Sequence, residues 1–225
     1  MENKTFFLSL LPLFSFMFFF SIPADADQVA YTNDGKKVIL KDDGTWVYSE
    51  ETKNMKISYD FRNSRWGMNK SQVKQTEKIE LVNESKDMLI YKGTVADFNC
   101  AIVYIFAYDK LVRTKYVIDE EHVYKNDYIY DYVKLKDGLQ KKYGKPKDSK
   151  SIWKNDLYKD EPQDWGLAIS IGHLVYFTTW ETPRTIITLA LYGENYEITL
   201  AIEYKSKELA ELEEKKKEDE VFDDF

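Results

Sequence analysis

Strand-like segments occur in two consecutive groups along this chain, and each group follows one helix-like segment. Only a few turn-forming residues separate neighbouring strands within a group, and strands joined this closely pair antiparallel. The predicted fold class is therefore α+β, with antiparallel meander sheets packed by two short helices. Two tandem helix-plus-sheet units would fit this order, although no residue-level repeat accompanies it. The predicted strands are 88–95, 98–107, 110–118, 167–171, 174–181, 185–192 and 196–204.

Both predicted helices have clear end signals. Asn69 is a good N-cap and Gln72 completes a capping box, which predicts a helix over 70–79. The second helix should begin after Asn126 and end at Gly144. Its apolar positions recur at helical spacing and form one stripe. They are Tyr128, Tyr132, Leu135, Leu139 and Tyr143.

The N-terminal segment has the features of a secretory signal peptide. An apolar run, Phe6 to Pro23, is followed by Ala24-Asp25-Ala26, the small-residue pattern that signal peptidase recognises. We therefore expect removal of residues 1–26 by cleavage between Ala26 and Asp27, which would leave a periplasmic or secreted protein. An uncleaved membrane anchor is the alternative, but acidic residues without a basic cluster follow the run. No other segment of the sequence resembles a membrane span.

Turn signals divide the rest of the chain. Asn33-Asp34-Gly35 and Asp42-Asp43-Gly44 punctuate residues 27–50 as a small three-stranded β-meander. A polar segment then predicts a linker, and the helices and strands named above form one α+β domain. The C-terminal residues predict a charged helical tail that is exposed and frays. The boundaries are 51–60 for the linker, 61–204 for the α+β domain and 205–225 for the tail.

The charge and the single cysteine limit the function classes. The chain has a net charge of −7, which becomes −6 without residues 1–26, because these hold Glu2, Lys4 and Asp25. An acidic chain is unsuited to sequence-independent nucleic-acid binding and to adhesion on anionic lipid. Cys100 has no partner for an intrachain disulfide, and its β-forming surroundings predict a buried, unreactive thiol.

Aromatic residues are frequent, with 17 tyrosines and 5 tryptophans. Such side chains can cover a twisted sheet, or they can form a face that binds sugars or proteins. Most of them match strand or helix periodicity, which favours the first interpretation.

Three segments resemble parts of bacterial envelope proteins of uncharacterised function. Residues 32–46, TNDGKKVILKDDGTW, are similar to a motif common at the N-terminus of such proteins. Residues 65–73, RWGMNKSQV, and 139–146, LQKKYGKP, resemble secreted or lipoprotein domains that pair these two helices. A more distant similarity is to the helix-plus-antiparallel-sheet fold of outer-membrane assembly lipoproteins and β-lactamase-inhibitor proteins. The resemblance implies a bacterial, exported α+β protein, although the lipid-attachment cysteine of the lipoprotein members is missing, and it implies no catalytic residue.

Residues that could carry chemistry are sparse. His122 and His173 lack a second histidine or cysteine at ligand spacing, so zinc catalysis is not indicated. His122 follows Asp119-Glu120-Glu121, for which a solvated loop is favoured over an ion site. Asp42-Asp43-Gly44 lacks the calcium-loop pattern, and no phosphate loop or nucleophile motif is present. The sequence therefore predicts no catalytic residue, cofactor or metal.

Arg65 and Glu77 are the most informative polar pair. Arg65 precedes Trp66-Gly67 where the first helix begins, and Glu77 lies on that helix. We favour an ion pair that fixes the helix on the sheet. The alternative is an arginine that faces a cleft and binds an anionic ligand.

Together these patterns predict a non-enzymatic, exported binding module for a protein or cell-wall partner, which it contacts through a sheet face or exposed aromatics. Nucleic acid is not an expected partner. An envelope-polymer hydrolase is the alternative, and it requires a cleft with two carboxylates of divergent pKa. An inhibitor of a secreted enzyme is a third hypothesis, which rests on fold analogy.

Overall fold

The computed structural model describes residues 28–32, 37–41, 43–49 and 58–223. The chain divides into two units, 1–57 and 58–225. The predicted signal peptide and its cleavage site at Ala26 and Asp27 lie outside the described residues, as does most of the predicted linker. Among the described residues, no helix has both the length and the apolar character needed to cross a membrane.

The first unit contains a three-stranded antiparallel sheet. Its strands are β1 (Gln28–Tyr31), β2 (Lys37–Leu40) and β3 (Trp46–Tyr48), paired in the order β1-β2-β3. The small meander predicted over 27–50 is therefore confirmed. In its second turn, Asp43 Oδ1 accepts a hydrogen bond from the Thr45 backbone N–H at 2.8 Å. The predicted first turn, 33–35, lies outside the described residues.

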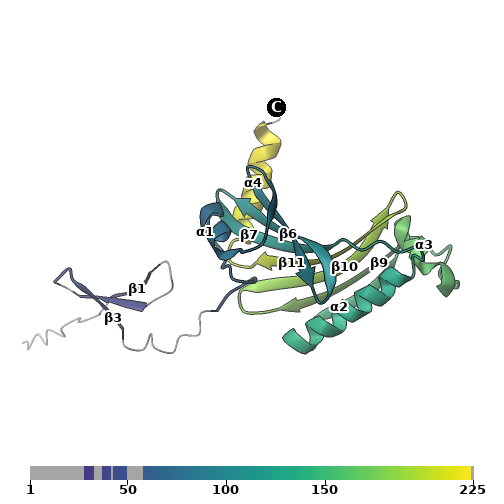
Figure 1. Ribbon diagram of the computed structural model, residues 1–225, viewed down its shortest axis with the longest axis horizontal. Helices are drawn as coiled ribbons and strands as arrows, with labels where there is room; N and C mark the ends of the chain where they lie inside the picture. Colours follow the sequence, from purple (N-terminus) through teal and green to yellow (C-terminus); the bar gives the residue numbers. More distant parts are fainter. Residues whose placement is uncertain (1–27, 33–36, 42, 50–57, 224–225) are drawn as a thin grey trace, which may run out of the picture. The chain divides into compact units, whose positions relative to one another are not determined.

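An antiparallel sheet of eight strands forms the second unit (Figure 1). Its strands are β4 (Leu81–Glu84), β5 (Met88–Val95), β6 (Phe98–Ala107), β7 (Lys110–Ile118), β8 (Asp148–Trp153), β9 (Leu174–Glu181), β10 (Thr185–Glu194) and β11 (Glu197–Ser206). The helices are α1 (Lys70–Thr76), α2 (Asp127–Tyr143), a 3-10 turn η2 (Pro162–Asp164), α3 (Trp165–Ser170) and α4 (Ala210–Asp223). The predicted α+β class with antiparallel meanders is confirmed.

The strand order is β4-β5-β6-β7-β11-β10-β9-β8. Each half of the sheet is thus a four-stranded meander that follows one main helix, α1 or α2, in agreement with two tandem helix-plus-sheet units. The last strands of the two halves, β7 and β11, pair at the centre, where Ile202 lies opposite Tyr116 and Tyr204 opposite Thr114. We call this β7–β11 pairing the seam.

Three helices cover one face of the sheet, and α4 lies on the other. The core combines Val73 of α1, Leu135 of α2 and Ile169 of α3 with inward-facing strand residues such as Ile102 and Leu189. We call this side the helix face. On the opposite, open face, α4 contacts β6 and β7. Figure 1 shows α2 along one side of the sheet and α4 rising from the other.

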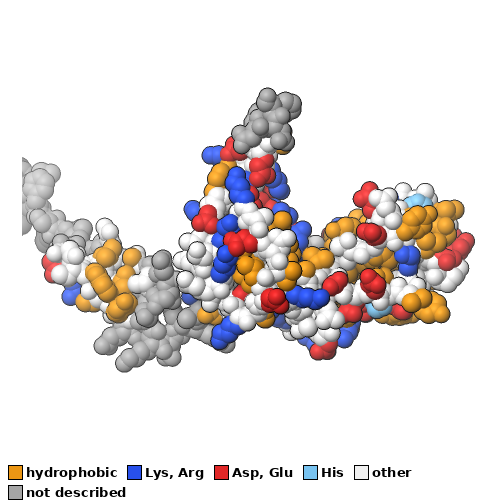
Figure 2. All heavy atoms as spheres, turned by 45° about the horizontal axis from the view of Figure 1, so that its top comes forward, with side chains coloured by type: hydrophobic (Ala, Val, Ile, Leu, Met, Phe, Trp, Pro, Cys, Tyr) orange, Lys and Arg blue, Asp and Glu red, His pale blue; other side chains and the backbone are white. Residues whose placement is uncertain are grey.

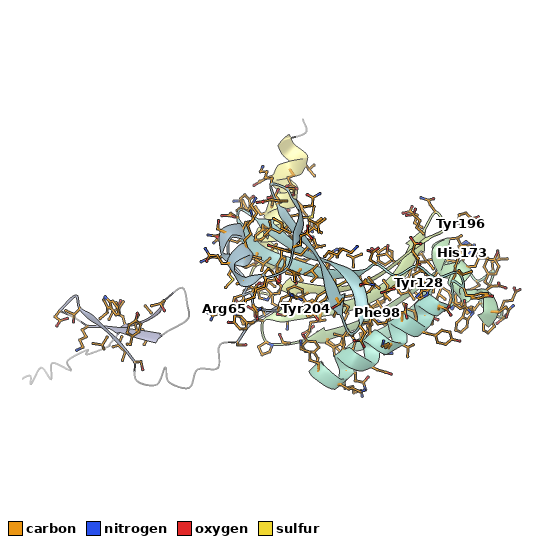
Figure 3. The ribbon with its side chains drawn as sticks, viewed as in Figure 1. Arg65, Phe98, Tyr128, His173, Tyr196 and Tyr204 are labelled. Atoms are coloured by element: carbon orange, nitrogen blue, oxygen red, sulfur yellow. The ribbon has the colours of Figure 1, made fainter. Side chains whose placement is uncertain are left out.

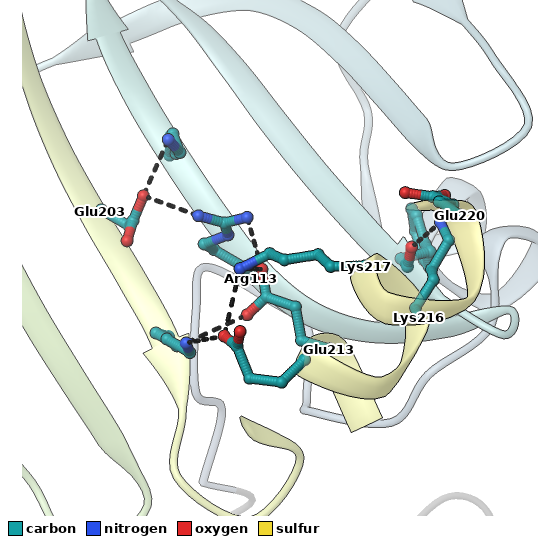
Figure 4. A network of polar contacts seen from close by, with 10 residues as sticks. Arg113, Glu203, Glu213, Lys216, Lys217 and Glu220 are labelled. Carbon is teal, nitrogen blue, oxygen red and sulfur yellow. Dashed lines mark hydrogen bonds and ion pairs between the residues drawn. The ribbon is translucent and has the colours of Figure 1, made fainter. Parts of the chain in front are cut away.

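A buried charge anchors α4. The Glu213 carboxylate lies in ion-pair contact with Arg113 of β7 and, at 3.4 Å, with Lys205 of β11 (Figure 4). Arg113 also pairs with Glu203 at 3.5 Å. The charged helix predicted within 205–225 is present as α4, but the expectation that it is exposed is wrong at Glu213, which is buried on the open face.

The predicted strand over 167–171 is wrong, because these residues lie largely in α3. A short apolar run is compatible with a strand or a helix. Here the segment is a helix that packs closely against the backbone of Lys125 and Asn126. A Cβ added to Gly166 would lie 2.3 Å from the Lys125 backbone carbon, so only glycine fits at this contact. The sequence predicts no strand where β8 lies, because this segment is polar. As an edge strand, β8 buries few side chains and therefore needs no apolar pattern.

The predicted helix ends are largely confirmed. Asn69 and Gln72 form the reciprocal capping box, with both hydrogen bonds at 2.9 Å, although α1 already ends at Thr76. The Asn126 side chain precedes α2 but makes no capping bond. Its Oδ1 instead accepts a hydrogen bond from the Gly166 N–H at 2.6 Å, because α3 packs against this point and competes for the amide.

Candidate functional site

Tyrosines from three neighbouring strands meet at the seam on the helix face. Tyr104 of β6, Tyr116 of β7 and Tyr204 of β11 are at most 8% exposed. Phe61, from the segment before α1, packs among them with its ring centroid 5.5, 4.9 and 5.0 Å from theirs. For these tyrosines the interpretation as sheet-covering residues is confirmed, and their rings join the two halves of the sheet.

A pocket of about 400 Å³ lies beside this aromatic cluster. Buried Tyr116 and Tyr204 form its floor. Its walls come from the segment before α1, the C-terminal end of α2 and the turn between β9 and β10. Figure 3 labels Tyr204, which marks its position. We call it the seam pocket, and its lining is Ser58, Tyr59, Asp60, Phe61, Arg62, Tyr116, Lys142, Tyr143, Thr182, Pro183, Arg184, Thr185 and Tyr204.

A buried carboxylate holds Arg62 in the pocket wall. Arg62 Nε and Nη2 donate to the two oxygens of Glu77 at 2.8 and 3.1 Å. The Glu77 side chain is 1% exposed, and the Tyr104 hydroxyl also donates to it. Burial acts to lower the pKa of Arg62, but hydrogen bonds with Glu77 and Tyr116 raise it overall, so the guanidinium stays charged.

Arg65 does not pair with Glu77 in the structure. Its guanidinium lies 6.0 Å from the centroid of the Tyr59 ring, and its Nε is buried without a hydrogen-bond partner among the described residues. A tight turn, closed by the bridge between Phe61 and Ser64, directs Arg62 to Glu77 instead. Both arginines precede the same helix, so the sequence gives no signal that separates them.

A second arginine closes another wall of the pocket. Arg184 in the β9–β10 turn contacts Asp60 at 3.1 Å and donates to both oxygens of Glu208 at 2.9 and 3.1 Å. Burial raises the pKa of Asp60, while the Trp66 N–H, at 3.0 Å, and Arg184 act against this. The Asp60–Arg184 pair therefore ties the segment before α1 to the second half of the sheet.

The floor of the pocket offers protonated phenol groups. Burial raises the pKa of Tyr204 well above its ordinary value, and the neighbouring Tyr143 adds to the effect. Burial also raises the pKa of Tyr116, although the charge of Arg62 opposes this. Both hydroxyls therefore keep their protons at neutral pH and can donate as well as accept hydrogen bonds.

Neither histidine of the chain lies in the described lining of the seam pocket. Asp60 is the one carboxylate in the described lining of the seam pocket. His122 Nε2 lies 2.5 Å from Asp131 of α2, rather than beside the acidic residues that precede it. His173 is half-buried near Tyr158. The part of the chain that the structure describes contains no group of three or more potential metal ligands.

Exposed apolar side chains gather at the end of the second unit that carries α3 (Figure 2). Val123, Tyr124 and Tyr196 are 94%, 76% and 67% exposed. These residues lie on loops, and Tyr196, which the sequence predicts as the first residue of a strand, lies in the turn before β11. They form a second surface, well separated in Figure 3 from Arg65 and Tyr204.

Comparison with known proteins returned no match to a family model, to a curated protein or to a solved structure.

Proposed function

We propose that this chain is a non-enzymatic, exported binding module that recognises a protein or cell-wall partner through the seam pocket. The observation that carries this proposal is the state of the charged groups in the pocket wall. Arg62 is neutralised by Glu77, and Arg184 by Asp60 and Glu208. Such groups are fixed in position and suited to recognition, because ordering them costs little when a partner binds.

Hydrolysis fits the pocket less well. Cleavage of a glycosidic bond by the common route requires two carboxyl groups that flank the bond. Asp60 is the one carboxylate in the described pocket lining. It already accepts a hydrogen bond from the Trp66 N–H and contacts Arg184. Glu208, the other carboxylate partner of Arg184, is exposed and does not belong to the described pocket lining. The geometry thus favours binding over catalysis.

Export rests on the sequence of residues 1–26, which precede the described residues. The predicted cleavage before Asp27 would place the pocket in the periplasm or outside the cell. An envelope location agrees with partners such as exported proteins and cell-wall polymers.

The test is capture from an envelope extract with the full chain, expressed with its own N-terminal segment and purified from the culture. N-terminal sequencing should begin at Asp27. Bound material would be compared for the wild type, for Tyr59→Ala in the pocket and for Tyr130→Ala on α2. Tyr130 is a matched control, because it is an exposed tyrosine outside the pocket lining.

The proposal predicts a partner that the wild type and the Tyr130→Ala variant retain and the Tyr59→Ala variant loses. A partner held equally by all three proteins would refute recognition through the pocket. Absence of any retained material at high bait occupancy would refute the binding function itself.

A further inference from the structure

We infer that the group bound in the seam pocket is a neutral saccharide unit, an inference that rests on the proposed binding function. The pocket combines three properties that such a ligand requires. These are a wall without surplus charge, fixed groups that can donate and accept hydrogen bonds, and tyrosine rings beside them.

The charge balance of the lining argues for a neutral ligand. Arg62 and Arg184 both have carboxylate partners within 3.1 Å, and Asp60 shares the second of these pairs. Lys142 lies at the rim, with its ammonium 5.0 Å from the Tyr143 ring centroid. A single exposed ammonium attracts an anion weakly, because water and salt screen it. A charged ligand would therefore find little net attraction here.

The polar groups match the hydroxyl groups of a sugar. Glu77 accepts from Nε and Nη2 of Arg62, and Tyr116 is a further hydrogen-bond partner of this guanidinium. Because an arginine carries five N–H groups, donor capacity remains for another acceptor. The phenol groups of Tyr116, Tyr143 and Tyr204 can donate and accept, as can each sugar hydroxyl. Because ion pairs and packing hold the pocket wall, these groups would lose little conformational freedom on binding.

Aromatic rings supply the apolar contact. A saccharide ring carries hydroxyls at its edge and C–H groups on its two faces. Tyr59, Tyr143 and Tyr204 present ring surface along the pocket, and such rings bury large areas at low entropic cost. The volume of about 400 Å³ lies near the lower end of the range of about 300–1,000 Å³ typical of small-ligand sites. One or two sugar units suit this space.

Saturation-transfer NMR with the purified full chain tests this inference. The probes are glucose, galactose, N-acetylglucosamine and the β-1,4-linked disaccharide of N-acetylglucosamine, each titrated separately. Acetate and inorganic phosphate are the charged comparators. Tyr59→Ala removes one aromatic wall, and Tyr143→Phe removes one hydroxyl but keeps the ring. Tyr130→Ala is again the matched control.

We expect transfer to ring protons of at least one sugar, and a dissociation constant about fivefold higher or more in both pocket variants. The control should bind like the wild type. Sugar binding that both pocket variants retain, or that Tyr130→Ala also weakens, would overturn the inference. Pocket-dependent binding of acetate or phosphate without any sugar would also overturn it, while leaving the proposed binding function intact. If no probe binds but the envelope capture depends on Tyr59, the saccharide inference fails alone; if both experiments are negative, both proposals fail.

Discussion

Arg62 and Glu77 form a two-point ion pair, with Nε–Oε1 and Nη2–Oε2 distances of 2.8 and 3.1 Å. Glu77 is the C-cap residue of α1, and Arg62 belongs to the segment that leads into that helix. The pair therefore links the start and the end of one short structural unit. Since the Tyr104 hydroxyl also donates to Glu77, the same carboxylate fixes this unit to β6.

Replacing Glu77 by Gln should strongly destabilise the fold. The Arg62 charge would lose its buried partner, and breaking one side of such a pair costs about 3–5 kcal/mol. Urea unfolding followed by circular dichroism measures the change. Glu84→Gln is the control, because Glu84 pairs with Lys74 on the exposed surface, where solvent and salt screen the pair, so this substitution should change stability little. Equal losses in the two variants would show that the buried pair has no special weight.

The two helical glycines Gly166 and Gly138 should respond to alanine in opposite directions. A Cβ at Gly166 would meet backbone atoms of Lys125 and Asn126 at 2.3 and 2.4 Å, whereas nothing lies within 4 Å at Gly138. Gly166→Ala should cost more than about 3 kcal/mol by overpacking. Gly138→Ala should stabilise α2 by about 0.5–1 kcal/mol. Thermal melts of both variants test this, and a stable Gly166→Ala protein would contradict the close packing of α3.

Cys100 should be unreactive in the native protein. Its side chain is buried, and burial raises the pKa of the thiol to about 11. The fold therefore favours the protonated thiol. This contribution to stability is complete below the ordinary pKa and is lost as the pH rises through about 11. A colorimetric thiol reagent at pH 8 should label the protein only after denaturant is added, and rapid labelling of the native state would disprove this.

Glu213 should hold α4 on the sheet, while its neighbour Glu214 should not. Glu213 is 4% exposed and contacts Arg113 and Lys205, whereas Glu214 is exposed. Glu213→Gln should cost about 3 kcal/mol, the lower end of the range for breaking one side of a buried ion pair, because Arg113 and Lys205 keep partial access to water. The same substitution should make a protease cut within α4, at 210–223, faster than in the wild type. The Glu214→Gln control should be cut at the wild-type rate, and faster cutting in that variant would show that general charge loss is responsible.

Local signals in the sequence were sufficient for much of this architecture. The Asn69–Gln72 capping box and the stripe along α2 each depend on residues a few positions apart, so they can be recognised without tertiary knowledge. Burial also alternates along β10, and a period of two can likewise be recognised from neighbouring residues. The predicted order of elements then indicated the antiparallel class.

Tertiary contacts determined the features that the sequence could not reveal. Gly166 belongs to a helix because its backbone must approach Lys125, a residue some forty positions earlier. Arg62 rather than Arg65 reaches Glu77 because of the turn at Phe61 to Ser64. The residues that line the seam pocket come from segments far apart in the sequence, so no spacing pattern along the chain predicts the pocket.

The pairing of β11 with both β7 and β10 also constrains the order in which the protein can be completed. Among the strands of the described eight-stranded sheet, β11 is the last to be synthesised, and it lies at the centre. Until it is present, each half has an unsatisfied row of backbone groups, at β7 and at β10, and such edges invite association with other chains. A nascent chain that has not yet reached residues 197–206 is consequently a candidate client for a holding chaperone.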